Sequence, residues 1–445
     1  MALRQTLTAL MIPTIFWSSV PFRAIRMVLG YCTVWRHSAH PDAVNLCSIF
    51  SLLYPSLTKI AMLLARYYDG VELHRDAKII YARFLTPHRV ISTCRSSTGG
   101  LHDDLGYLYN HQSCEPSGHN LSAELHRLAV EQPDEYRTVI AQRYDLPSVG
   151  CATMGTAANM QTAAIVHETF RELEVVAVVT AGVETNAGRA GDPASYHEVA
   201  GQYEALHAPQ SGTIVIMLLL NHELAPGTLV EAVTLVTEAK TATLQELNVP
   251  SCYADGLATG TGTDQVGLAA RLGGIALRGA QKHTKLGELL AHVVQAALRQ
   301  ALARQNGLTP VGQCRTMALL RRLGATEAGL SAAICAYLNH DDAALLQRNL
   351  PVILNDPPTV AAVMALLHLR DQLRWGVLPH SCMPELFSTY AAQLAAAVSG
   401  RPPRSVAYQQ TLANAPTSLA PAAMLDLIAR AFALGFSEKW ALSLE

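Results

Sequence analysis

A loop rich in glycine and alanine carries the side chains best suited to binding a polar ligand. It spans residues 180–192 and directly follows the apolar run Val175 to Val179. Small residues allow backbone N–H groups to approach a ligand closely. The amide of Asn186, the guanidinium of Arg189 and the carboxylate of Asp192 can hydrogen-bond amide and carboxyl groups in fixed geometry. The segment therefore predicts a substrate-binding loop at the end of a strand.

A second loop of small residues, 259–264, reads Thr-Gly-Thr-Gly-Thr-Asp. It begins like a dinucleotide-binding fingerprint, but residue 265 is glutamine, so the pattern G-x-G-x-x-G fails and predicts no nucleotide site. We expect Thr263 to contact substrate and Asp264 to take part in acid/base chemistry at the edge of a strand over 266–270.

His283 stands where a long helix over 284–305 is expected to begin. A helix amino terminus disfavours protonation, so the imidazole stays neutral, as a general base requires. A histidine that merely borders the helix cap is the alternative. Lys282 beside it offers a cation that could face a developing oxyanion.

A second helix, predicted over 226–247, carries Glu238 and Lys240. Two positions along a helix correspond to a rotation of about 200°, so these side chains cannot face the same site. We expect the stripe of Glu238 to face the pocket, with Glu238 as an orienting carboxylate or second base. Three further residues share that stripe: Thr234, Thr241 and Gln245.

The segment His102-Asp103-Asp104 and the residues after it have the types of a metal site. Further candidates are His111, Cys114, His119 and His126. Their spacing matches no zinc, EF-hand or H-E-x-x-H pattern. We therefore expect an irregular polar loop and no metal, and hold a metal site as the minority hypothesis.

Nucleophile motifs are equally sparse. The pattern G-x-S-x-G is absent, and only Cys94, beside Arg95, has a basic neighbour that favours a thiolate. Hydroxyls at expected strand ends belong to Ser92, Thr153 and Thr180, where capping is the commoner role. Gly99 and Gly100 form a small-residue loop that we expect to contact substrate. A covalent mechanism stays open.

Composition narrows the function classes. The chain has 445 residues, of which 50% are hydrophobic and 15% charged, with net charge −2 and a pI near 6.8. This balance lacks the basic footprint of a nucleic-acid-binding protein. The nine cysteines form no C-x-x-C pair, which favours a reducing, cytoplasmic location. The oligomeric state is not predicted.

Residues 1–64 differ in composition from the rest, with one acidic residue against five basic ones. Their apolar runs, 7–20 and 46–57, are shorter than the roughly 20 residues needed to span a bilayer. We expect an N-terminal extension, which is either a targeting segment or a non-native addition upstream of a start at Met62.

The elements that would position these residues favour an α/β (α+β) fold, a layered sandwich with a mixed or antiparallel sheet. Strands are predicted over 78–84 and 89–94 as a pair, and over 148–154, 175–181 and 213–221, the last of them central. Helical, alanine- and leucine-rich sequence follows Gly307, broken by prolines. The predicted divisions are an extension (1–64), a catalytic domain (65–306) and a C-terminal all-helical domain (307–445).

Taken in order, these segments resemble the adenosylcobinamide amidohydrolase family of corrinoid salvage, over roughly residues 67–305. The similarity rests on five segments: Ile91-Ser92-Thr93 through Gly99-Gly100-Leu101, Met154 to Asn159, Thr180 to Asp192, Thr237 to Thr241 with Thr259 to Asp264, and Lys282 to Glu288. It implies hydrolysis of the amide that joins aminopropanol to the corrin ring, with the corrinoid as substrate and no cofactor of the protein.

Amide hydrolysis needs an acid/base set and a group that stabilises the oxyanion. From chemistry alone we assign His283, Asp264 and Glu238 to the first task, and Lys282 or backbone N–H groups to the second. Two other functions stay open at this level. One is a non-catalytic corrinoid-binding protein, and the other is an amidohydrolase that acts on another secondary amide.

Overall fold

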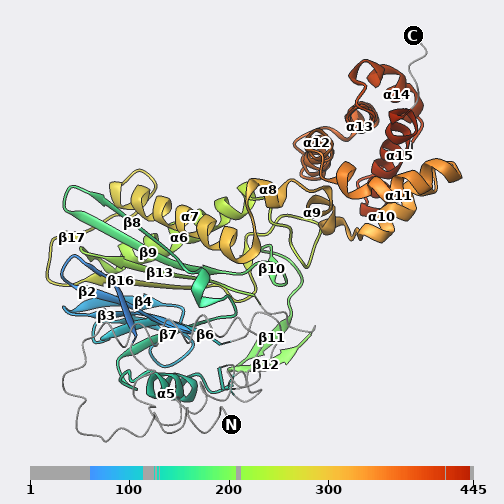
Figure 1. The fold of residues 1–445 in the computed structure, drawn as a ribbon. Coiled ribbons are helices and arrows are strands. Elements are labelled where there is room, and N and C mark those ends of the chain that lie inside the picture. Colours follow the sequence, from blue (N-terminus) through green and yellow to red (C-terminus); the bar gives the residue numbers. More distant parts are fainter. Residues whose placement is uncertain are drawn as a thin grey trace, which may run out of the picture. The chain divides into compact units, whose positions relative to one another are not determined.

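The computed structural model describes residues 61–113, 131–206, 212–415 and 417–440, together with Leu125, Leu128 and Ala129. The chain divides into two compact units, Met1–Ala61 and Met62–Glu445. The helices and strands described below lie in the second unit (Figure 1). Its first strand begins at Met62, so the last three residues of the predicted extension belong to the fold, whereas residues 1–60 lie outside the described residues.

A six-stranded sheet with the order β5-β4-β16-β13-β9-β8 forms the centre of the molecule. Strand β13 (Ile214–Leu220) pairs in parallel with β16 (Gln265–Arg271) and antiparallel with β9 (Leu173–Ala181). All seven residues of β13 are buried, which confirms the predicted central strand. Antiparallel pairing adds three further strands: β4 (His88–Ser92), β5 (Gly100–His102) and β8 (Ala164–Phe170).

A five-stranded sheet with the order β1-β2-β3-β6-β7 packs against the first. Its strands are β1 (Met62–Tyr67), β2 (Val71–Asp76), β3 (Ile79–Phe84), β6 (Tyr107–Gln112) and β7 (Cys151–Thr156). The predicted pairing of the strands over 78–84 and 89–94 is wrong, because β3 belongs to this sheet and β4 to the other. In a sandwich, a short connection can carry the chain from one sheet to the other.

The sheets and helices form layers (Figure 1). An apolar core between the sheets includes Leu108 and Met154 from the five-stranded sheet and Val178 and Met217 from the six-stranded sheet. Helix α5 (Pro133–Arg143) packs against the outer side of the five-stranded sheet. Helices α6 and α7 cover the outer side of the six-stranded sheet. The predicted layered α/β sandwich is confirmed, and its sheets are mixed.

Local sequence explains where the two long helices begin and end. Helix α6 (Pro226–Glu246) has proline in its first turn, where the missing N–H costs nothing. Helix α7 (Lys285–Asn306) begins after Thr284, whose side chain accepts a 3.0 Å hydrogen bond from the N–H of Gly287. It ends at Gly307, which adopts the left-handed conformation. Both predicted helices are confirmed within two residues.

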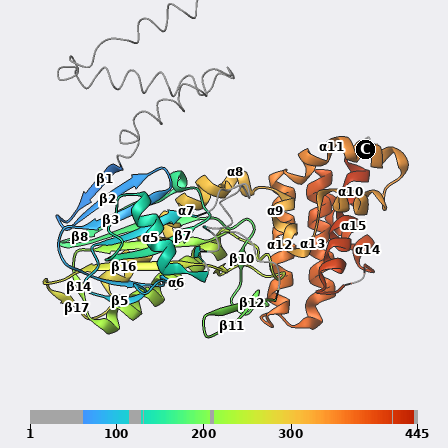
Figure 2. The same ribbon diagram turned by 90° about the horizontal axis from the view of Figure 1, so that it is seen from below.

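From residue 310 onward the described chain is helical (Figure 2). These helices share a second apolar core. The helices are α8 (Pro310–Gln313), α9 (Thr316–Leu320), α10 (Glu327–Cys335), α11 (His340–Leu354), α12 (Pro357–Arg374), α13 (Met383–Ser399), α14 (Ser405–Leu412) and α15 (Pro421–Lys439). The predicted C-terminal helical region is therefore confirmed.

Three two-stranded ribbons complete the fold. They are β10 (Ala187–Gly188) with β15 (Gly260–Thr261), β11 (Tyr196–Val199) with β12 (Gln202–Ala205), and β14 (Glu223–Leu224) with β17 (Ala276–Leu277). The first ribbon joins the two loops that the sequence marked for chemistry.

No single helix in the described part of the chain is long and apolar enough to cross a bilayer. Helices α11 and α12 reach the required length only together, and the chain bends by 79° between them.

Candidate active site

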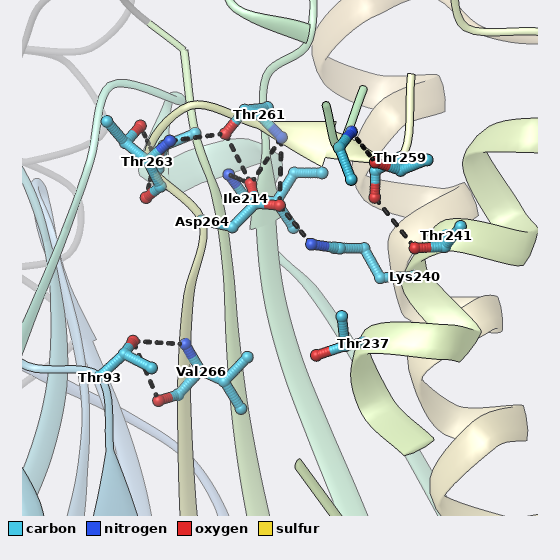
Figure 3. A network of polar contacts seen from close by, with 12 residues as sticks. Thr93, Ile214, Thr237, Lys240, Thr241, Thr259, Thr261, Thr263, Asp264 and Val266 are labelled. Carbon is cyan, nitrogen blue, oxygen red and sulfur yellow. Dashed lines mark hydrogen bonds and ion pairs between the residues drawn. The ribbon is translucent and has the colours of Figure 1, made fainter. Parts of the chain in front are cut away.

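Three segments that are far apart in the sequence meet at the amino end of β16. The loop 180–192 follows β9, the loop 259–264 precedes β16, and ribbon β10–β15 ties the two loops together. Helix α6 approaches the same point, where the Thr241 hydroxyl donates a 3.1 Å hydrogen bond to the carbonyl of Thr259 (Figure 3). We call Lys240, Thr261, Thr263, Asp264 and the loop 180–192 the strand-end cluster.

A lysine–aspartate pair lies at the centre of the strand-end cluster (Figure 3). Nζ of Lys240 is 2.5 Å from Oδ2 of Asp264, and the two side chains are 11% and 15% exposed. The other carboxylate oxygen accepts hydrogen bonds from the Thr261 hydroxyl at 2.6 Å and the Ile214 N–H at 3.2 Å. Both carboxylate oxygens of Asp264 accept hydrogen bonds from groups of the protein, so Asp264 orients Lys240 and the loop 259–264. Its predicted acid/base role stays a prediction.

Lys240 is the residue that the sequence reasoning missed. Lys240 is buried in the cluster, whereas Glu238 is exposed, so the expectation that the stripe of Glu238 faces the pocket stays a prediction. Lys240 lies one turn after Val236 and one turn before Leu244, and both of these apolar residues are fully buried. A lysine on the apolar stripe of a helix was therefore the signal that could have found it.

Thr263 occupies the solvent side of the cluster. Its hydroxyl donates a 2.9 Å hydrogen bond to the carbonyl of Gly212, and its own carbonyl accepts a 2.6 Å bond from the Thr213 hydroxyl. The side chain is exposed beside the buried ion pair. This position fits the predicted contact with substrate, which stays a prediction.

The loop 180–192 uses Asn186 to hold its own shape. Asn186 is 3% exposed, donates to the carbonyl of Gly212 at 2.7 Å and accepts from the Tyr253 hydroxyl at 2.5 Å. Both ends of the amide are thus taken up by the protein. The geometry favours a structural role for Asn186 over the predicted grip on substrate.

Arg189 and Asp192 also brace the loop, but each keeps hydrogen-bonding groups that no described residue uses. Oδ2 of Asp192 accepts from the Arg189 N–H at 2.7 Å and from the Ser251 hydroxyl at 2.6 Å. One terminal nitrogen of Arg189 donates to the carbonyl of Leu257 at 3.1 Å. Within the part of the chain that the structure describes, the other guanidinium N–H groups and Oδ1 of Asp192 have no hydrogen bond. The two side chains therefore retain binding capacity.

The other predicted catalytic residues are exposed and lie outside the strand-end cluster. Lys282 forms an ion pair with Glu238, and these side chains are 65% and 46% exposed. His283 is also exposed, next to the cap of α7. Asp264 precedes β16, whereas His283 follows its carboxyl end. The structure therefore does not bring His283 and Asp264 together, and the roles of His283, Glu238 and Lys282 stay predictions.

Gly99 and Gly100 shape a turn around Cys94. A side chain at residue 99 would overlap the carbonyl oxygen of Cys94, and Gly100 has φ +85°. The Cys94 thiol is buried, 2.9 Å from the Ser96 hydroxyl, and accepts from the Thr153 N–H at 3.3 Å. The glycines are thus required by the turn, and their predicted contact with substrate stays a prediction.

The hydroxyl candidates for a covalent mechanism are buried. Oγ1 of Thr180 accepts a 2.8 Å hydrogen bond from the Asn110 amide, which joins the two sheets. The hydroxyls of Ser92 and Thr153 are buried without a partner among the described residues. A covalent route through any of these groups would require the substrate to reach the layer between the sheets.

The described metal candidates do not converge. Asp103 pairs with Arg89, and that hydrogen bond lowers the pKa of the Asp103 carboxyl. His111 bonds the Tyr136 hydroxyl at 2.7 Å, and burial lowers its pKa to about 3. Among the described residues no group of three or more His, Cys, Asp or Glu could hold a metal ion. Cys114, His119 and His126 lie outside the described residues.

The strand-end cluster has the chemistry to polarise a carbonyl group. A buried ammonium group stabilises negative charge more strongly than an exposed one, because water screens it less. The hydroxyls of Thr261 and Thr263 and the exposed backbone of Gly262 lie beside it. The arrangement suits attack on an amide or ester carbonyl whose oxygen becomes an oxyanion.

Comparison with known proteins shows the family. A family model described as adenosylcobinamide amidohydrolase matches residues 64–310. The match contains both sheets except the first two residues of β1, together with α6, α7 and the whole strand-end cluster. An uncharacterized protein of Methanocaldococcus jannaschii is 34% identical over 188 residues, which are 40% of this chain and 72% of that protein. Helices α9 to α15 lie outside the family match.

Proposed function

Because the chain belongs to the adenosylcobinamide amidohydrolase family, we propose that it hydrolyses the amide between aminopropanol and the corrin ring of adenosylcobinamide. The products are adenosylcobyric acid and aminopropanol, and the reaction serves corrinoid salvage. The observation that carries the proposal is the meeting of three distant segments around the buried pair of Lys240 and Asp264.

The proposed reaction needs one water molecule. Water adds to the amide carbon, the carbonyl oxygen gains negative charge, and the C–N bond then breaks as a proton passes to the amine nitrogen. Lys240, oriented by Asp264, stabilises the oxyanion. Thr263, Arg189 and Asp192 hold the amide-bearing rim of the corrinoid. The proton-transfer role that the sequence assigns to His283 and Glu238 is not part of the proposal, because both side chains are exposed outside the strand-end cluster.

The cobalt of the corrinoid belongs to the substrate, so the proposal requires no cofactor. Hydrolysis should therefore survive exhaustive chelation, and activity that returned only with zinc or manganese would contradict this part. A reducing, cytoplasmic location is also proposed. It is supported by the six cysteines of the described residues, all of which are free thiols.

The test is to incubate the purified full-length protein with adenosylcobinamide and to follow adenosylcobyric acid by mass spectrometry. We expect equal amounts of the acid and of aminopropanol. Binding without turnover, measured by equilibrium dialysis, would indicate a non-catalytic corrinoid-binding protein. Absence of both binding and turnover would favour an amidohydrolase that acts on another secondary amide.

A further inference from the structure

We propose that the C-terminal helices complete a substrate subsite, in which Trp375, at the carboxyl end of α12, holds one amide-bearing arm of the corrinoid together with Arg189 and Asp192. The inference rests on the proposed function. It concerns residues beyond the family match, which ends at residue 310.

The first observation is that charged side chains fasten α12 to the segment 250–258. The carboxylate of Asp255 forms ion pairs with Arg370 and Arg374. Arg322 donates to the carbonyl of Asp255 at 3.1 Å and pairs with Asp371 at 2.7 Å. The side chains of Arg370, Arg322 and Asp371 are no more than 7% exposed. Removing one partner would leave a buried charge uncompensated, so the contact has a defined geometry.

The second observation is that the same segment braces the predicted binding loop. Ser251 donates to Asp192, and Leu257 accepts from Arg189, as described above. The segment 250–258 therefore contacts the loop 180–192 on one side and α12 on the other. The position of Arg189 and Asp192 relative to α12 is fixed through this segment.

A cleft of about 280 Å³ lies where these parts meet. Its lining residues are Arg189, Asp192, Ala254, Gly256, Arg374 and Trp375. A side chain at residue 256 would approach Cδ of Arg189 within 3.3 Å, so glycine keeps the cleft open. Trp375 ends α12 and is 48% exposed, and Gly376, with φ +72°, turns the chain away from it. The indole is thus presented at the rim.

The chemistry of the lining fits a carboxamide on an apolar support. A primary amide offers one acceptor oxygen and two donors, which complement guanidinium N–H groups and a carboxylate. Arg189 and Asp192 keep such groups free, and the indole of Trp375 offers an apolar face beside them. The volume lies below that of sites for whole drug-sized ligands, so the cleft takes one arm of the corrinoid.

The experiment compares Trp375→Ala with Trp440→Ala in the full-length protein. Trp440 follows α15, is 57% exposed and does not line the cleft, which makes it a matched control. Aromatic packing contributes up to about tenfold in affinity, so Trp375→Ala should raise KM for adenosylcobinamide about tenfold and leave kcat unchanged. Trp375→Phe should retain most of the affinity, and Trp440→Ala should match the wild type.

A second variant fills the cleft from the other side. Gly256→Val should also raise KM, because its side chain would occupy the space beside Arg189. Equal KM values for the wild type, Trp375→Ala and Gly256→Val would overturn the subsite while leaving the proposed function intact. If the wild type neither binds nor hydrolyses adenosylcobinamide, the proposed function fails and the subsite fails with it.

Discussion

Two lysine–carboxylate pairs each include a residue of α6, yet the pairs differ in burial. At the amino end of β16, Lys240 and Asp264 are 11% and 15% exposed. In the other pair, Lys282 and Glu238 are 65% and 46% exposed. An exposed ion pair contributes little to stability, and salt screens its charges, whereas the charges of a buried pair are screened much less. Chemistry that depends on charge therefore belongs to the pair of Lys240 and Asp264.

The space around the backbone also differs between the loop before β16 and the turn after it. A side chain at Gly260 would overlap Oδ2 of Asp264 and stand 2.8 Å from Nζ of Lys240. At the other end, a side chain at Gly274 would meet no atom within 4 Å. Close packing fixes the geometry of the first pair, and open surface surrounds the turn that follows the strand.

The largest expected effect comes from the lysines. Lys240→Met should lower kcat/KM for adenosylcobinamide about 10²- to 10³-fold, the size of effect that follows removal of one oxyanion-stabilising group. Lys282→Met should stay within about twofold, because its pair is exposed. Steady-state kinetics on both variants, with circular dichroism to verify the fold, makes the comparison. Equal losses in the two variants would remove the distinction between the two pairs.

The second-largest effect is expected among the carboxylates of the two pairs, Asp264 and Glu238. Asp264→Asn keeps the acceptor for the Thr261 hydroxyl but removes the charge that orients Lys240. We expect kcat to fall about 10- to 100-fold, less than for a group that itself transfers the proton. Glu238→Gln serves as the matched control and should leave kcat nearly unchanged. A loss near 10⁴-fold in Asp264→Asn would instead assign proton transfer to Asp264.

Glycine substitutions test the packing difference without removing a charge. Gly260→Ala should lower the free energy of unfolding by about 1–3 kcal/mol, as overpacked sites do. Gly274→Ala should stay within about 0.5 kcal/mol of the wild type, as open surface sites do. Urea unfolding of both variants measures the difference. A neutral Gly260→Ala variant would show that the loop 259–264 can move away from the ion pair.

Two buried histidines, one near each end of β16, make stability depend on pH. His88 pairs with Arg271 at the carboxyl end, and burial lowers its pKa from 6.5 to about 4. His111 lies opposite Gly155, which bonds Gln265 at the amino end, and its pKa falls to about 3. At pH values between 6.5 and the lowered pKa of each histidine, the unfolded chain binds more protons than the folded chain. The free energy of unfolding therefore falls as the pH decreases through this range.

Each histidine should contribute a slope of up to about 1.4 kcal/mol per pH unit in that window. His88→Gln keeps a hydrogen-bonding side chain for the carbonyl of Thr86 but cannot titrate. Its free energy of unfolding should therefore depend less steeply on pH than that of the wild type. Urea unfolding between about pH 7 and about pH 5 provides the measurement. Identical slopes would mean that the pKa of His88 is the same in the folded and the unfolded chain.

The smallest effect is expected for His283→Ala. Because the imidazole is exposed at the far end of β16 from Asp264, its removal should change kcat by less than about twofold. A loss of about 10²- to 10⁴-fold, as for a proton-transfer group, would support the role assigned from the sequence. Such a result would move the reaction centre to the carboxyl end and reverse the comparison.

The sequence by itself determined the elements whose signals are local. An apolar run predicts β13, Pro226 and Thr284 mark helix starts, and Gly307 marks a helix end. The residue types in the loops 180–192 and 259–264 predict a polar site after β9 and before β16. These features depend on backbone geometry and on neighbours within a few residues, which one segment of sequence contains.

Only the tertiary structure decided which groups meet. Helical spacing separated Glu238 from Lys240 but could not say which one the six-stranded sheet would bury. It also could not show that residues distant in sequence take up the hydrogen-bonding groups of the Asn186 amide. Nor could it show that Trp375 and Arg189 line the same cleft. Burial and polar partnership depend on packing between elements more than a hundred residues apart, and no local pattern encodes that packing.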